Sequence, residues 1–150
     1  MSNINEQLKM TGHLKIELNG KLVRDLDNLV VTAGKTFVAS SILKTTSNSP
    51  AAMTHMGVGT GTTNPDAADT ALETQVGSRK AFTTSAASSA AVVTYICAFA
   101  AGEGTGALTE AGIFNHATGT STNMLARTEF SVVNKGASDS MTITWTVTVS

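Results

Sequence analysis

The chain has 150 residues, a usual length for one domain whose core needs no metal or disulfide to hold it together. Its formal net charge is −1, and only 14% of its residues are charged, about half the usual share. The ten Lys and Arg residues are scattered among eleven acidic ones, which argues against direct binding to nucleic acid. The amino terminus lacks the regions of a signal peptide, and no apolar run reaches about 18 residues. We therefore expect neither export by that route nor a membrane partner.

The first twelve residues are polar, with isolated apolar side chains at Ile4, Leu8 and Met10. Three apolar positions are too few to anchor a helix, so we predict an N-terminal arm over residues 1–12 that becomes ordered on a partner. The remaining residues, 13–150, are predicted to form a single domain. If Ile4, Leu8 and Met10 dock on a neighbouring protein, the arm is an interface.

A β-hairpin and a short helix are predicted next. The segments Leu14 to Leu18 and Lys21 to Leu26 flank Asn19-Gly20, whose tolerance of positive φ is the strongest short signal for a hairpin. Thr32 can cap a helix whose apolar residues recur at helical spacing as far as Leu43. Gly34 lies in the first turn of this helix and is expected to weaken it.

The rest of the chain is predicted to form strands. Met53 to Gly61 is expected to be a strand that enters a tight glycine-rich turn, Gly57-Val58-Gly59-Thr60-Gly61, before a loop as far as Leu72. The other predicted strands are Val76 to Ser85, Ala91 to Phe99, Leu108 to Asn115, Met124 to Val133 and Ser140 to Val149. This spacing favours an all-β, mainly antiparallel fold, a β-sandwich or jelly roll with one short helix and an N-terminal arm.

The last predicted strand alternates large apolar residues with threonines. Its apolar positions are Met141, Ile143, Trp145, Val147 and Val149. Its threonines are Thr142, Thr144, Thr146 and Thr148. Period-two alternation places the two sets on opposite faces of the sheet. The apolar set is predicted to enter the core. The threonine set is a candidate contact surface, because it costs little to desolvate and is favoured in strands.

Gly34-Lys35-Thr36 follows an apolar strand and opens a helix, as the end of a phosphate-binding P-loop does. The motif requires another glycine five residues before its Gly-Lys pair, and Leu29 occupies that position. Without this glycine the backbone cannot wrap phosphate groups with its N–H donors. We therefore do not predict nucleotide binding.

Other candidate chemistry is weak. His13, His55 and His116 lie in separate segments without metal-ligand spacing, although a zinc site assembled by the fold stays open. Cys97 lies in an apolar run and is predicted to be a buried, inert side chain. Glu103 and Glu110 could form a carboxylate pair, but an aromatic groove for sugar is missing. We predict no catalytic, metal or cofactor-binding residue, no small-molecule substrate and no enzyme activity; long loops keep an enzyme or sugar-binding module as an alternative.

Glu110 and Arg127 form a candidate ion pair. A hairpin over Leu108 to Phe130 would bring the two side chains close together across neighbouring strands. A cross-strand ion pair is the ordinary interpretation, with a contribution of about 0.2 to 1 kcal/mol if it is exposed. A salt bridge to another subunit is the alternative, which would place Glu110 and Arg127 in an interface.

Several blocks of the sequence resemble parts of a known class of proteins. They are Asn28 to Lys35, Met56 to Thr63, Asp69 to Glu73, Leu108 to Asn115, Met124 to Thr128, Asn134 to Asp139 and Thr142 to Trp145. With this order of elements, most of the chain resembles the small structural proteins of tailed-bacteriophage virions.

The resemblance implies a structural protein of the virion. Its most specific form is a capsid decoration (cement) protein, a homo-oligomer that binds the outer lattice of the major capsid protein and stabilises the head. The alternative is a structural protein of the tail, baseplate or fibre attachment. Either expectation agrees with a weakly charged β-protein whose arm and strand edges bind other proteins.

Overall fold

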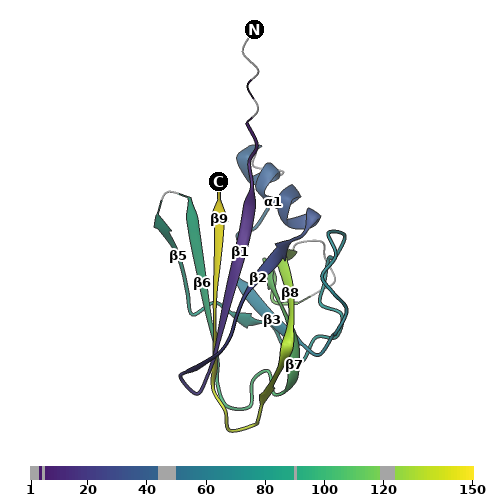
Figure 1. The fold of residues 1–150 in the computed structure, drawn as a ribbon, viewed down its shortest axis with the longest axis vertical. Coiled ribbons are helices and arrows are strands. Elements are labelled where there is room, and N and C mark those ends of the chain that lie inside the picture. Colours follow the sequence, from purple (N-terminus) through teal and green to yellow (C-terminus); the bar gives the residue numbers. More distant parts are fainter. Residues whose placement is uncertain (1–3, 5, 44–49, 90, 119–123) are drawn as a thin grey trace.

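The computed structural model describes residues 4, 6–43, 50–89, 91–118 and 124–150. This part of the chain is mostly antiparallel β-sheet with one helix (Figure 1). The all-β, mainly antiparallel fold predicted from the sequence is confirmed. Residues 1–3 and 5 of the predicted arm lie outside the described residues.

Within the described residues, nine strands form one sheet. They are β1 (Met10–Leu18), β2 (Lys21–Val30), β3 (His55–Gly59), β4 (Lys80–Ala81), β5 (Thr84–Ser89), β6 (Val92–Phe99), β7 (Gly106–Phe114), β8 (Met124–Lys135) and β9 (Met141–Val149). Helix α1 (Thr32–Leu43) lies between β2 and β3 in the chain. The strand order is β4-β3-β7-β8-β2-β1-β9-β6-β5.

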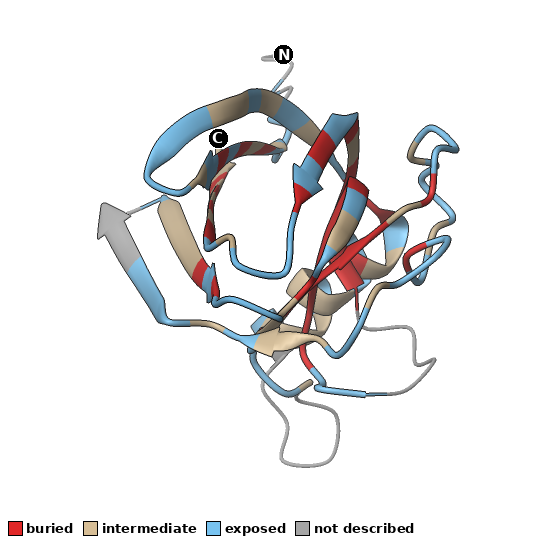
Figure 2. Cartoon of the chain, turned by 90° about the horizontal axis from the view of Figure 1, so that it is seen from below, coloured by how far each residue is buried: buried red, intermediate tan, exposed pale blue. Residues whose placement is uncertain are grey.

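The sheet curls round until its two ends meet (Figure 2). β4 and β5 stand at opposite ends of the strand order but are almost continuous in the chain. Between them, the Phe82 N–H donates to the Thr54 carbonyl at 2.9 Å and the Thr83 N–H donates to the Ile96 carbonyl at 2.8 Å. Between Phe82 and Thr83 the chain therefore passes from a position beside β3 to a position beside β6. The single strand predicted over Val76 to Ser85 is wrong, because this crossing divides it.

The core lies inside the curled sheet and contains the apolar face of β9. Met141, Ile143, Trp145 and Val147 are buried, as predicted, and Val149 at the strand end is half-buried. β9 pairs with β1 on one edge and with β6 on the other. The Trp145 indole Nε1–H donates to Asn28 Oδ1 at 2.6 Å, which satisfies its buried polar group.

The predicted hairpin is confirmed, since Asn19 and Gly20 turn the chain between β1 and β2 with φ values of 50° and 79°. Helix α1 also forms, and it packs against β8 (Figure 1). An added Cβ at Gly34 would lie 2.1 Å from the Leu125 carbonyl oxygen. Gly34 therefore allows the close approach of α1 to β8.

The arm is shorter than predicted. β1 begins at Met10, and the Lys9 N–H donates to the Ser150 carbonyl at 2.7 Å, next to the first residue pair of β1 and β9. Residues 10–12 thus belong to the sheet, and Gly12 is buried against Asn28.

Candidate interaction surface

The four predicted threonines lie on the outer side of β9, where β6 is one neighbour. Register pairs Thr142 with Ala98, Thr144 with Ile96, Thr146 with Thr94 and Thr148 with Val92. Residues directly opposite in adjacent strands point to the same side of a sheet. These eight residues of β6 and β9 form one continuous uncharged surface, which we call the threonine face.

The other neighbour of β9 carries charge. Register pairs Thr146 with His13, Thr144 with Lys15 and Thr142 with Glu17 on β1. The next strand, β2, places Asp25 opposite Lys15 and Asp27 opposite His13. The outer surface of the sheet is therefore divided into a charged half over β1 and β2 and the uncharged threonine face over β9 and β6.

His13 marks this division. Its Nδ1 lies 2.8 Å from Asp27 Oδ1, and its Nε2 contacts Asp25 Oδ1. Hydrogen bonding to Asp27 raises the pKa of His13 against the opposing effect of burial, and Asp25 adds to the increase. The protonated imidazolium can donate from both ring nitrogens, which matches two carboxylate acceptors.

The threonine face suits contact with protein. Its four β9 threonines and the Val92, Thr94 and Ile96 side chains are half-buried already, so little further polar surface must be dehydrated when another surface covers them. The alternation within β9 was enough to predict the threonines. The contribution of β6 was missed, because the identity of a neighbouring strand depends on the topology.

Glu110 and Arg127 meet within this chain, and both side chains are buried. Arg127 Nη2 lies 2.9 Å from Glu110 Oε2. Arg127 Nε also donates to Glu110 Oε2, at 3.0 Å. Three backbone N–H groups complete the bonds to the Glu110 carboxylate, those of Thr74 at 2.7 Å, Glu73 at 3.0 Å and Gly61 at 3.1 Å. Neither side chain is exposed for a bridge to another subunit.

Arg127 extends this network to the preceding loop. Its Nη1 donates to Asp69 Oδ2 at 2.8 Å, and its Nη2 donates to the Thr63 carbonyl at 3.1 Å. The buried pair thus joins the segment of residues 60–75 to β7 and β8. Its role in this structure is to hold that loop in place.

The network explains the glycines near β3. An added Cβ at Gly59 would lie 2.4 Å from Glu110 Oε1, and one at Gly61 would lie 2.5 Å from Glu73 Cβ. Gly57 and Gly59 belong to β3, and none of the three glycines has a positive φ. The tight turn predicted over Gly57 to Gly61 is therefore wrong, because these glycines make room for the loop and the carboxylate.

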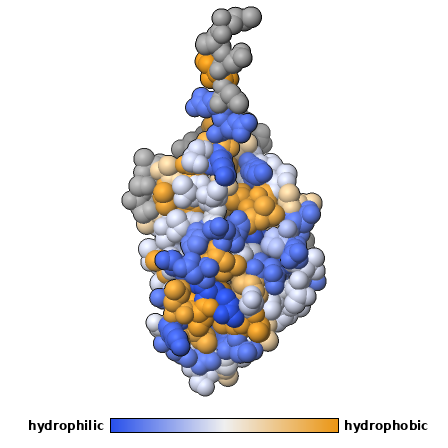
Figure 3. All heavy atoms as spheres, in the orientation of Figure 1, coloured by the Kyte–Doolittle hydropathy of each residue, from blue (hydrophilic) through white to orange (hydrophobic). Residues whose placement is uncertain are grey.

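The described part of the arm carries two exposed apolar side chains, Ile4 at 85% and Leu8 at 69% exposure. A groove runs between the arm and α1. Its lining residues are Leu8, Met10, Lys35, Val38, Ala39 and Ile42. We call it the arm groove. Figures 1 and 3 have the same orientation, and Figure 3 shows apolar side chains below the arm, in the region where Figure 1 draws α1.

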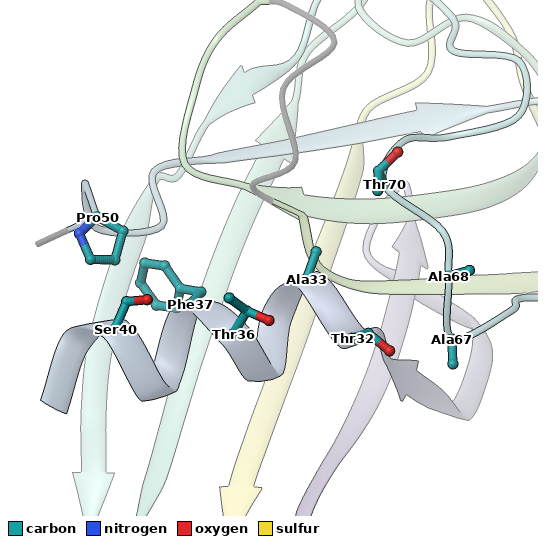
Figure 4. Close-up of a pocket in the computed structure, with 9 residues that line it drawn as sticks. All are labelled: Thr32, Ala33, Thr36, Phe37, Ser40, Pro50, Ala67, Ala68 and Thr70. Atoms are coloured by element: carbon teal, nitrogen blue, oxygen red, sulfur yellow. The ribbon is translucent and has the colours of Figure 1, made fainter. Parts of the chain in front are cut away.

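A second hollow of about 360 Å³ lies on another side of α1 (Figure 4). Thr32, Thr36, Phe37 and Ser40 line it from the helix, and the loop of residues 67–70 lines the opposite wall. These residues provide hydroxyl and apolar groups. Since no charged residue is among the nine that line it, we assign it no ligand.

Other chemistry-bearing side chains are placed as follows. Cys97 is buried, as predicted, and burial raises the pKa of its thiol to about 12. Within the described ranges, no cluster of His, Cys, Asp and Glu has the arrangement of a metal site. Over the same residues, no helix has the length and hydrophobicity needed to span a membrane.

Comparison of the chain with models of known protein families, with curated proteins and with solved structures found no match.

Proposed function

We propose that this chain is a structural protein of a tailed-bacteriophage virion, most specifically a capsid decoration protein that binds the outer lattice of the major capsid protein. The observation that supports this proposal most directly is the threonine face, an uncharged, half-buried surface on paired strands. The sequence resemblance to virion proteins supports the same class. In this role the protein stabilises the head at the capsid surface.

The threonine face would make the lattice contact. Hydroxyl groups can exchange bonds with water for bonds with a neighbouring protein, while the threonine methyls and the Val92 and Ile96 side chains add apolar area. The charged half over β1 and β2 would favour water and so define one edge of the contact. Many weak contacts on a repeating lattice add up through avidity.

The contact can be tested with capsids from the phage that encodes the chain, stripped of this protein. Thr144→Lys places a charge at the centre of the threonine face, and we expect binding measured by co-sedimentation to fall at least about tenfold, because a buried unpaired charge is costly. Lys15→Thr, on the adjacent strand outside the face, is the matched control and should bind like the original protein. Equal binding by both variants would contradict the proposed surface.

Copy number separates the decoration role from the alternative of a tail, baseplate or fibre-attachment protein. A protein that covers the capsid lattice must be present in hundreds of copies in each virion, whereas a tail component is present in far fewer. Quantitative mass spectrometry of purified virions measures this directly. A low copy number would reject capsid decoration and favour the tail alternative.

A further inference from the structure

We infer that the N-terminal arm of one copy pairs as an antiparallel strand with the arm of a second copy, and that this pair covers the arm groove of each. This pairing goes beyond the proposed lattice contact and gives a surface to the homo-oligomer that the sequence resemblance implies. It concerns the purified chain alone, so its test and the capsid-binding test can fail separately.

The core-facing side of β1 continues beyond the sheet. Leu14 and Ile16 are buried, and alternate residues of a strand share a face. Counting back by two from Leu14 gives Gly12, Met10, Leu8, Glu6 and Ile4. Leu8 therefore lies on the core-facing side of the chain that leads into β1, yet it is 69% exposed, and Ile4 is 85% exposed.

The arm also has an open edge beside α1. Pairing of β1 with β2 ends at Gly12 and Asn28, and β2 then pairs with β8 at Leu29. On its other edge, the arm is bonded to β9 through Lys9 and Ser150. Along the described residues 6–11, no strand of this chain pairs on the side facing α1. Unpaired strand edges of this kind accept a further strand.

The arm groove provides a surface under that edge. Val38, Ala39 and Ile42 supply apolar area from α1, and Ile42 is 76% exposed. Lys35 adds one positive charge to the lining. An incoming strand with alternating apolar residues and one acidic residue on the same face would match this groove, and the arm itself has that pattern.

The charge of Glu6 helps to select the register in which the two arms pair. With Gln7 opposite Gln7 of the second copy, Ile4 lies opposite Met10, and Glu6 lies opposite Leu8, which lines the groove together with Lys35. The neighbouring register centred on Glu6 would place two like charges directly opposite each other, which is unfavourable. Pairing centred on Gln7 is self-complementary, so a two-fold axis repeats every contact.

The first test is the mass of the purified protein in solution, measured by light scattering and by sedimentation over a range of concentrations. We expect a dimer whose dissociation constant rises at least about tenfold in the double variant Leu8→Ser, Ile42→Ser, because apolar side chains leave the contact. The control variant Leu22→Ser, Val132→Ser alters exposed apolar residues on β2 and β8 and should dimerise normally. A monomeric original protein, or equal dimerisation of both variants, would overturn the inference.

The second test uses a single engineered thiol. Gln7→Cys places one thiol of each copy beside the two-fold axis, while the buried native Cys97, with a pKa of about 12, stays unreactive in the folded protein. A short bis-maleimide should therefore produce a covalent dimer. Ser131→Cys, at an exposed position of β8, is the control; cross-linking no greater than in this control would reject arm pairing.

The third test removes the arm without touching the sheet. Deletion of residues 1–8 leaves Lys9 and all of β1 in place, so the shortened protein should keep its fold, measured by circular dichroism, and lose dimerisation. Deletion of residues 1–12 would also remove the pairs from Met10 to Gly12 with β9 and is unsuitable. A shortened protein that still dimerises like the original would contradict the proposed interface.

Discussion

Glu110 shows how one side chain can fix a long loop. Its carboxylate accepts hydrogen bonds from three backbone N–H groups of residues 61–74 and from Arg127. The Glu110 and Arg127 side chains are both buried. A buried carboxylate is stable only when such partners replace water. Loss of this side chain would leave Arg127 buried with fewer acceptors.

We predict that Glu110→Ala lowers the free energy of unfolding by about 3 to 5 kcal/mol, the usual effect of breaking a buried ion pair. Urea denaturation followed by circular dichroism measures the change. Glu17→Ala, at an exposed position of β1, should change stability by less than about 0.5 kcal/mol. A similar small effect at Glu110 would mean that the network does not stabilise the loop.

His13 gives stability a dependence on pH. Asp27 and Asp25 raise its pKa, so the folded protein binds the proton more tightly than the unfolded chain. This contribution is fully present below the unfolded pKa of about 6.5 and disappears as pH rises through the higher folded pKa. Lys15 on β1 and the carboxylates of β2 are the charged groups facing it.

We therefore predict that His13→Gln removes a modest decrease in stability between about pH 6 and pH 8. The measurement is the urea midpoint as a function of pH at low salt, since the site is partly exposed and screened. His116→Gln is the control and should keep the decrease. An unchanged profile in His13→Gln would assign the decrease to other groups.

At the level of elements, α1 depends on its contact with β8 more than on its own sequence preference. Replacing glycine by alanine inside a helix usually stabilises it by up to about 1 kcal/mol. In α1 the added methyl of Gly34→Ala would collide with the Leu125 backbone. The sign of the effect should therefore reverse.

We predict that Gly34→Ala destabilises the protein by about 1 to 3 kcal/mol, the usual range for overpacking. Thr36→Ala is the matched control, because it lies on the exposed part of the same helix and improves helix propensity. Thermal denaturation of the two variants compares them directly. Stabilisation by both substitutions would show that the helix can move away from β8 without cost.

For the whole molecule, Cys97 reports on the closure of the sheet. Its Sγ lies 3.6 Å from the Lys80 carbonyl oxygen and 3.7 Å from that of Ala81, where β4 meets β6. It is the single cysteine of the chain. Access to this thiol therefore requires the two ends of the sheet to separate.

We predict that maleimide labelling of Cys97 is slow and accelerates with urea in parallel with global unfolding, because closure and core are one cooperative unit. Mass spectrometry of samples taken over time measures the rate. The exposed thiol of Ser131→Cys should react rapidly without urea and serves as the reference. Labelling of Cys97 that does not respond to urea would show that the contact between β4 and β6 opens locally, without global unfolding.

The sequence by itself determined the features that depend on near neighbours in the chain. The alternation in β9 predicted which side chains enter the core, and Asn19-Gly20 predicted the hairpin, because both follow from local backbone geometry. The apolar surroundings of Cys97 likewise predicted its burial.

The tertiary structure alone decided what depends on distant segments. It placed β6 beside β9 to complete the threonine face and divided the segment of residues 76–85 where the chain passes from β3 to β6. It also gave Glu110 its backbone donors, which are 36 to 49 residues away in the chain. The glycines of β3 could be interpreted only once the atoms they accommodate were located. Local periodicity specifies the face on which a side chain lies, whereas strand order and long-range packing specify what that face meets.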